Sequence, residues 1–273
     1  MSFERYRVQV QIENDLGCYD LSLWSDFRSD LENYTLDDNK ELHLREALRR
    51  DAEDVFFKGM LSLCEAINNI GRGLHSWATV KLYYSVFYFL RCSLALRDCA
   101  IIRNKSLYLL KIARGATPVK KTSTKYRNDH IGVISIFEDE IGETDLLLTN
   151  KIDEQNVYRW LMEKRHQVHY RQRDFCEPEF ADFCSGIREL DSLQKLERQI
   201  ILYLRDEIPV YCFNDAHACL AIPIKRATLT QNELISHGLK LPDKGKREVL
   251  EKLMSILPSD DSEIYRLIND RQS

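Results

Sequence analysis

The fold is decided by residues 75–97, which read HSWATVKLYYSVFYFLRCSLALR. Apolar side chains recur there every three or four residues, which is the period of an α-helix. Leu82, Tyr83 and Phe89 fill the other faces, so the segment is apolar nearly all round. The main apolar stripe comprises Trp77, Val80, Tyr84, Phe87, Leu90 and Leu94. Such a helix needs neighbours on every side, and we therefore predict that it is the central helix of a bundle.

Further amphipathic segments in the sequence predict a mainly α protein with a bundle of four or more helices. Each carries apolar residues at helical spacing, and the ends are marked by glycine or proline. Two glycines, Gly71 and Gly73, end the first of these segments, and Pro178 suits the first turn of the last. The predicted helices besides the central one are 40–70, 150–171 and 178–204, with a short apolar segment at 131–141.

The two ends of the chain are predicted to carry smaller elements. Apolar and polar residues alternate from Arg5 to Ile12, which is typical of a half-buried β-strand. Beyond Pro209 the apolar stripe ends, and residues 218–224, which include Pro223, favour a short edge strand. We therefore predict three parts, namely a strand-bearing segment 1–40, a helical bundle 41–208 and a small α(+β) appendage 209–273.

Charge and composition exclude several classes of protein. The 273 residues include 39 Lys and Arg against 43 Asp and Glu, a net charge of −4, so any basic site must be local. Ten glycines and six prolines are few for a turn-rich β-sandwich or a disordered chain. The longest apolar run, 82–90, is far shorter than the about 20 residues that span a bilayer. We expect no membrane association.

The eight cysteines show neither a CxxC pair nor a zinc-binding spacing, and no secretory signal precedes them. Cys64, Cys92 and Cys184 lie in apolar helical stretches, where free cysteine behaves as a small hydrophobic residue. We therefore expect reduced thiols and a cytoplasmic protein.

Two basic segments are the candidates for binding nucleic acid. Residues 115–128, GATPVKKTSTKYRN, lack an apolar period and predict a mobile basic loop. Residues 164–173, KRHQVHYRQR, combine basic and aromatic side chains. Either segment could contact phosphates, and either could equally be a solvated basic face. The candidate residues are Lys120, Lys121, Lys125 and Arg127 in the loop and Lys164, Arg171 and Arg173 in the second segment.

Three short stretches are informative because of their order along the chain. The first is LYYSVFYFL at residues 82–90, followed by LAL at 94–96. The second is HIGVISIF at 130–137, behind the basic loop, and the third is RHQVHY at 165–170. Together they resemble the HEPN superfamily of small helical domains, especially a branch of short bundles often encoded beside a minimal nucleotidyltransferase. The resemblance covers roughly residues 74–204 and implies a HEPN-like helical bundle.

This resemblance implies a candidate site at Arg165 and His169. Many active HEPN proteins are metal-independent ribonucleases that carry an Arg, four to six residues, and then a His. Only three residues separate Arg165 from His169. Arg159 and His166 have the wider gap but lie on different helix turns, so His166 is the weaker candidate. The departure from the family pattern puts catalysis in doubt.

The chemistry of the pair suits RNA cleavage. Residues four apart share a helix face, so Arg165 and His169 are predicted to project together at the end of an apolar stripe. Cleavage needs a base, an acid and a cation beside the phosphorane, which histidine and arginine supply. In the alternative interpretation, Arg165 pairs with a carboxylate such as Glu163 or Asp145, and His169 is a structural histidine.

Two further roles concern neighbouring residues. In relatives paired with nucleotidyltransferases, a tyrosine just after the His accepts nucleotides, so the resemblance implies that Tyr170 is a possible acceptor, although there the tyrosine follows one residue later. His166, His169 and Glu163 have no further strong metal ligand within helical reach, so we expect neither a metal nor another cofactor.

Two functions remain open. The first is a non-catalytic HEPN-like subunit that serves as a docking or dimerisation module of a bacterial defence or toxin–antitoxin complex, with a co-encoded nucleotidyltransferase or ATPase as partner. The second is a metal-independent HEPN ribonuclease that uses Arg165 and His169 across a homodimer. The short gap between these residues favours the first. Both functions predict a homodimer and allow RNA as a ligand.

Overall fold

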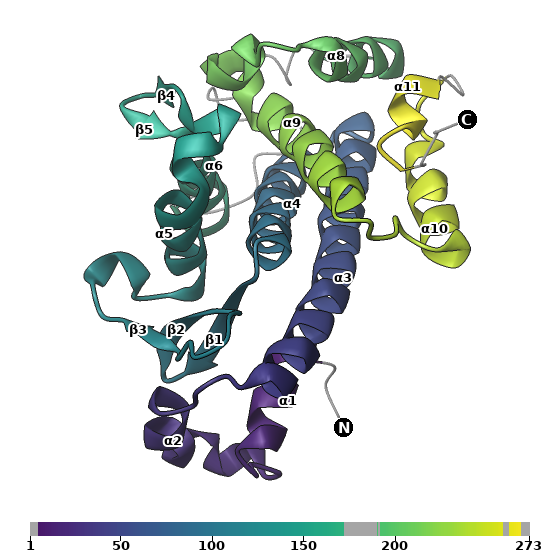
Figure 1. Cartoon of the computed structure of the whole chain (residues 1–273). Helices are drawn as coiled ribbons and strands as arrows, with labels where there is room; N and C mark the ends of the chain where they lie inside the picture. Colours follow the sequence, from purple (N-terminus) through teal and green to yellow (C-terminus); the bar gives the residue numbers. More distant parts are fainter. Residues whose placement is uncertain (1–4, 172–189, 191, 259–261, 269–273) are drawn as a thin grey trace. The chain divides into compact units, whose positions relative to one another are not determined.

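The computed structural model describes residues 5–171, 190, 192–258 and 262–268, and these divide into two compact units. Residues 5–55 and 90–141 form the first unit, whereas residues 56–89 and those from Gly142 onward form the second. The chain passes between the units within α3 (Asp38–Gly71) and again within α4 (His75–Leu96) (Figure 1). These two helices confirm the predictions for 40–70 and 75–97.

Helices dominate the described residues, which confirms a mainly α protein at that level of detail. The predicted division into three segments stays a prediction. None of the helices in the described ranges is long and apolar enough to cross a membrane. The remaining helices of four residues or more are α1 (Arg7–Asp15), α2 (Arg28–Glu32), α5 (Asp129–Ile141), α6 (Val157–His166), α8 (Leu193–Arg205), α9 (Asp215–Ser236), α10 (Lys244–Met254) and α11 (Ser262–Tyr265), with 3-10 turns at Leu21–Phe27 and Val210–Phe213.

The N-terminal segment is helical, so the predicted strand there is wrong. Helix α1 buries Val8 and Ile12, which lie four residues apart on one face. The carboxylate of Asp51 accepts hydrogen bonds from the backbone N–H groups of Arg7, at 2.8 Å, and of Val8, at 3.0 Å. The first N–H groups of any helix lack an acceptor within that helix. Asp51, more than forty residues away in the sequence, therefore stabilises the first turn of α1.

The first unit also contains a three-stranded antiparallel sheet in the order β1–β2–β3. Strands β1 (Cys99–Asn104) and β2 (Ser106–Lys111) form a hairpin around the single residue Lys105. Helix α5 packs against β2, since a Cβ added to Gly132 would lie 2.6 Å from the Leu107 side chain (Figure 1). The short apolar segment predicted at 131–141 is thus a helix that covers the sheet.

The basic segment 115–128, predicted to be a mobile basic loop, is not loop throughout, because it contains a short strand and a 3-10 turn. Strand β3 (Val119–Lys121) pairs with β2 and forms an edge of the sheet, and a 3-10 turn follows at Thr124–Tyr126. Lysines on an edge strand discourage pairing with another chain. Lys120 and Lys121 therefore have a structural role available that needs no nucleic acid.

The second unit places α6 behind a small hairpin. Strands β4 (Lys151–Ile152) and β5 (Gln155–Asn156) precede the helix, which begins at Val157 and not near residue 150 as predicted. Two 3-10 turns, Gly142–Thr144 and Leu146–Leu148, lead into the hairpin. The Asn156 side chain accepts a hydrogen bond from the Arg159 N–H at 3.0 Å, as expected of an N-cap residue.

The C-terminal part of the second unit is helical where the structure describes it. The predicted strand at 218–224 is wrong because this segment lies inside α9, together with Pro223. Of the helix predicted at 178–204, residues 178–189 and 191 lie outside the described residues, and the rest largely coincides with α8. The appendage was expected to mix strand and helix, and its described residues contain helices and turns only.

A close approach of α3 and α4 at Gly59 gives a first test of the packing. A Cβ added to Gly59 would lie 2.5 Å from Cε1 of Phe89, whose side chain is fully buried. We expect Gly59→Ala to lower the free energy of unfolding by about 1–3 kcal/mol through overpacking, despite the better helix propensity of alanine. Urea denaturation measures the loss. In Gly245→Ala, the matched control, the added Cβ meets Asp243 at an ordinary 3.6 Å, and no loss is expected. Equal stability of the two variants would contradict the close approach.

Candidate functional site

One face of helix α6 is buried against the rest of the second unit, and Arg165 lies on that face. Trp160, Leu161 and Val168 are buried, which confirms the predicted inward position of Leu161 and Val168. Arg165 is itself only 4% exposed. A guanidinium buried to this degree must be hydrogen-bonded or paired with a charge.

The contacts of Arg165 are with tyrosines. Its Nη2 donates hydrogen bonds to the hydroxyls of Tyr84 and Tyr170, both at 3.2 Å. The guanidinium carbon lies 5.1 Å from the ring centres of Tyr83 and Tyr84 and 5.4 Å from that of Tyr170, which permits cation–π attraction. Burial raises the pKa of Tyr83, and the charge of Arg165 only partly opposes this, so Tyr83 stays a neutral phenol. We call Arg165 with these three tyrosines the arginine cage.

The expected ion pair between Arg165 and a carboxylate is wrong for the part of the chain that the structure describes. Asp145 instead accepts hydrogen bonds from Tyr158 and Arg226, and no carboxylate of the described residues is paired with Arg165. The Nε atom of Arg165 is buried and has no hydrogen-bond acceptor there. The positive charge of the cage is therefore not neutralised by these residues.

A π-helical segment, Gln167–Arg171, continues α6 and shapes the cage. Side chains five residues apart meet on a π-helix, whereas on an α-helix they diverge. This explains how Tyr170 reaches the guanidinium of Arg165. Single turns of π-helix occur frequently at functional sites.

His169 lies beside the cage and contacts the ring of its Tyr170. Its ring centre is 4.4 Å from that of Tyr170 and 5.9 Å from that of Trp77. Nδ1 of His169 is buried and has no hydrogen-bond partner among the described residues. The predicted pair thus meets through Tyr170, which is itself 64% exposed.

The other predicted site residues are not all brought to the cage. The ring centres of His166 and Tyr170 are 5.8 Å apart, and Nζ of Lys164 lies 4.8 Å from the ring centre of Trp160. The side chain of Arg171 and the whole of Arg173 lie outside the described residues. The predicted basic loop belongs to the first unit, whereas α6 belongs to the second.

In the first unit, the basic residues have partners of their own. Lys125 forms an ion pair with Asp139 at 2.7 Å, and Lys121 lies 5.4 Å from the ring of Tyr126. Burial acts to raise the pKa of Asp139, but hydrogen bonds from Lys125 and Tyr126 outweigh it and lower that pKa. Lys125 is therefore engaged with a protein carboxylate, whereas Arg127 is exposed.

Three residues of α4 near this site were assigned only to the core by the sequence pattern. Tyr83 and Tyr84 contact Arg165, and Trp77 contacts His169. Trp77 was predicted to face inward on the apolar stripe, but its side chain is 44% exposed, so that prediction is wrong. The sequence did contain a signal for this site, namely the adjacent tyrosines Tyr83 and Tyr84. A buried tyrosine hydroxyl needs a hydrogen-bond partner, so such a pair in a core helix indicates a polar group nearby.

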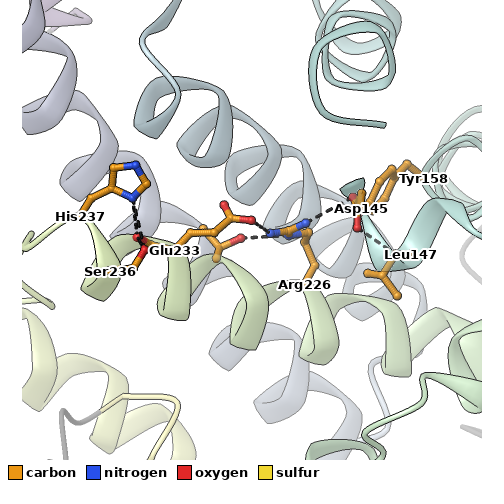
Figure 2. A network of polar contacts seen from close by, with 8 residues as sticks. Asp145, Leu147, Tyr158, Arg226, Glu233, Ser236 and His237 are labelled. Carbon is orange, nitrogen blue, oxygen red and sulfur yellow. Dashed lines mark hydrogen bonds and ion pairs between the residues drawn. The ribbon is translucent and has the colours of Figure 1, made fainter. Parts of the chain in front are cut away.

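A second polar cluster holds α6 against α9. Figure 2 shows Arg226 between Asp145 and Glu233. Arg226 donates to Asp145 at 3.3 Å, to Glu233 at 2.8 Å and to the Thr230 hydroxyl at 3.0 Å, while Tyr158 donates to Asp145 at 2.5 Å. Desolvation acts to lower the pKa of Arg226, but Tyr158, Glu233 and Asp145 more than offset it, so the guanidinium stays charged. Since Tyr158 belongs to α6, this cluster fixes the helix that carries Arg165.

The thiols and the metal-binding residue types form no further site in the described residues. Cys64 and Cys92 are buried free thiols, as predicted, and Cys184 lies outside the described part. Burial raises the pKa of Cys64 to about 12, which keeps it protonated. Within the ranges that the structure describes, no three His, Cys, Asp or Glu residues are grouped so as to hold a metal ion.

Comparison with known proteins does not identify a family. No protein-family model matches the chain, and no curated protein or solved structure matches it. The HEPN resemblance therefore stays a prediction.

Proposed function

We propose that this chain is a non-catalytic, HEPN-like subunit of a bacterial defence or toxin–antitoxin complex, and that its arginine cage binds a phosphate of RNA. The observation that carries the proposal is the environment of Arg165: it is 4% exposed, and within the described residues its hydrogen bonds go to the hydroxyls of Tyr84 and Tyr170. A buried cation in such surroundings is stabilised by an anion. Guanidinium groups favour phosphate because their fork of N–H donors matches its oxygens.

The geometry at His169 supports binding rather than cleavage. A histidine that acts as a general base is normally held in one tautomer and orientation by an acceptor on its second nitrogen. Nδ1 of His169 is buried without such an acceptor in the described residues.

Partners follow from the resemblance and belong to the same proposal. A homodimer would bring two arginine cages into one assembly, and a co-encoded nucleotidyltransferase or ATPase would be the second component. Tyr170 is the candidate nucleotide acceptor, and its exposure of 64% supports access by another protein.

The alternative function is a metal-independent ribonuclease across a homodimer. The observation in its favour is that Tyr170 contacts both Arg165 and His169 and so places the two predicted catalytic residues at one site.

RNA binding by the Arg165→Leu variant tests the proposal. We expect affinity to fall about 10- to 100-fold, since a hydrogen-bonded charge contributes about 1.5–3 kcal/mol, and the slope of log affinity against log salt to flatten by about one unit. Filter binding at two salt concentrations measures both quantities, and gel analysis should show intact RNA. Arg205→Leu is the control, because that side chain lies in the same unit, is 65% exposed and pairs with Glu263.

Several outcomes would contradict this proposal. Unchanged affinity in Arg165→Leu would remove the arginine cage as the phosphate site. RNA cleavage by the unmodified chain that persists in EDTA and is lost in His169→Ala would establish the ribonuclease instead. If circular dichroism shows that Arg165→Leu is unfolded, competition between RNA and inorganic phosphate for the unmodified chain tests the same site.

A further inference from the structure

A hollow in the surface of the second unit lies beside the arginine cage. Helices α3, α4 and α10 contribute its walls. Trp77 belongs to this wall and also contacts the ring of His169. Trp77 is not part of the cage, but His169 in turn contacts Tyr170 of the cage, with 4.4 Å between the ring centres. Its lining residues are Glu65, Asn68, Asn69, Trp77, Lys81 and Leu253.

Trp77 offers an aromatic face at this hollow. Its side chain is 44% exposed, although the residue occupies a helix that is otherwise largely buried. Exposed aromatic side chains next to basic groups are the platforms on which single-stranded nucleic acids stack their bases.

The polar residues of the hollow suit the edge of a base. The side-chain amide of Asn69 makes no hydrogen bond within the described residues, so it can supply a donor and an acceptor. The amide of Asn68 donates instead to the carbonyl of Leu253 at 2.8 Å, which ties α10 to α3. Lys81 and Glu65 form an ion pair at 2.5 Å on the same wall. The Asn68 amide thus joins two walls of the hollow, whereas the Asn69 amide lines it without a hydrogen bond to the described residues.

The spacing along α4 connects this hollow to the phosphate site. Trp77, Lys81 and Tyr84 lie at positions i, i+4 and i+7, so they share one face of the helix. They span roughly 10 Å of helix length at 1.5 Å per residue. Trp77 lines the hollow, and Tyr84 holds Arg165, with Lys81 between them.

We infer that this hollow is a nucleobase subsite, in which a base of the bound RNA stacks on Trp77 while the phosphate of the same nucleotide lies at Arg165. The inference rests on the proposed function for its phosphate, and it adds the ligand class that the hollow recognises. Stacking accepts any base, and the Asn69 amide adds hydrogen bonds to the base edge.

Calorimetric titration of the whole chain with adenosine 5′-monophosphate, ribose 5-phosphate and adenosine tests the inference. The monophosphate should bind most tightly. Trp77→Ala should weaken its binding about 10-fold, or about 1.4 kcal/mol, while the affinity for ribose 5-phosphate stays unchanged. Trp77→Phe keeps a ring and should recover most of the loss. Tyr19→Ala is the control, since Tyr19 is an 84% exposed aromatic residue of the first unit.

The three ligands separate a failure of the hollow from a failure of the cage. If ribose 5-phosphate binds as tightly as the monophosphate, the base contributes nothing and the inference is overturned, whereas the phosphate site survives. If adenosine binds as tightly as the monophosphate and depends on Trp77, the hollow is supported and the cage is not the phosphate site. Unchanged monophosphate affinity in Trp77→Ala, or no binding of any of the three ligands, overturns the inference.

Discussion

Replacing Arg226 by leucine should lower the free energy of unfolding by about 3–5 kcal/mol, which is the usual loss when one partner of a buried ion pair is removed. Arg226 is 1% exposed and donates to Asp145, Glu233 and Thr230 (Figure 2). Without it, Asp145, which is 5% exposed, would lie in a buried site with no cationic partner among the described residues, hydrogen-bonded to the Tyr158 hydroxyl and to the backbone N–H of Leu147.

Chemical denaturation of Arg226→Leu beside Arg205→Leu measures this loss. The Arg205 pair with Glu263 is bidentate, at 2.7 and 2.8 Å, but largely exposed, so its removal should change stability by about 1 kcal/mol at most. The double variant Arg226→Leu, Asp145→Leu should recover part of the loss because no unpaired charge stays at Asp145. Equal stability of the two single variants would show that the cluster is hydrated and not a buried network.

Trp160→Ala should be almost as damaging, with a loss of about 3–5 kcal/mol from the cavity that it leaves. Trp160 is 1% exposed and is the largest of the fully buried side chains. Its Nε1 also donates to Asp153 at 3.1 Å, which joins α6 to the turn between β4 and β5. The variant would therefore loosen the start of the helix that carries Arg165.

Trp77→Ala is the matched control, since it removes the same side chain from a position that is 44% exposed in the same unit. Because Trp77 is partly buried, we expect a measurable but smaller loss than for Trp160, about 1–2 kcal/mol. Urea denaturation of both variants checks the difference. A comparable loss in the two would place Trp77 in the core, as its apolar stripe predicts, and would remove the aromatic face from the hollow.

The long helices could be predicted from the sequence, whereas the small elements could not. Helices α3 and α4 repeat the helical period over many turns, and Gly71 and Gly73 mark the break between them, so local information suffices for both. The segment from Arg5 to Ile12 fits two periods, because Val8 and Ile12 are four apart as well as alternating with polar residues. The hydrogen bonds from the first N–H groups of α1 to Asp51 stabilise the helix over the strand. Asp51 is more than forty residues away in the sequence, so a pattern read over a short segment does not include it.

The hairpin β1–β2 escaped prediction because its turn lacks the usual residues. Tight turns that need a positive φ normally contain glycine or asparagine, which mark them in a sequence. Here Lys105 adopts a φ of 53°, and Asp98, just before β1, adopts 56°. Neither residue is one of the two that usually mark such a turn. We infer that the packing of α5 against β2 contributes more to the position of the sheet than local turn preference does.

For the site, the sequence indicated the cation and the histidine but not their surroundings. Arg165 and His169 stood out because of their spacing, and the structure places both around Tyr170. Their joint projection assumed an α-helix, whereas the chain is π-helical over Gln167–Arg171, and no residue pattern signals that change of repeat. Tyr84 comes from a different helix, so its hydroxyl becomes a partner of Arg165 only on folding.

The discontinuous make-up of both units has a consequence for synthesis on the ribosome. All residues of the first unit have been made once Ile141 is added, but the second unit also needs residues 56–89, which are made early, and residues from Gly142 onward. Translation at about 5–20 residues per second needs roughly 7–26 s for positions 142–273. During that interval the apolar residues of 56–89 have yet to meet α6, α8 and α9, so a nascent chain exposes them to chaperones and to other unfinished copies.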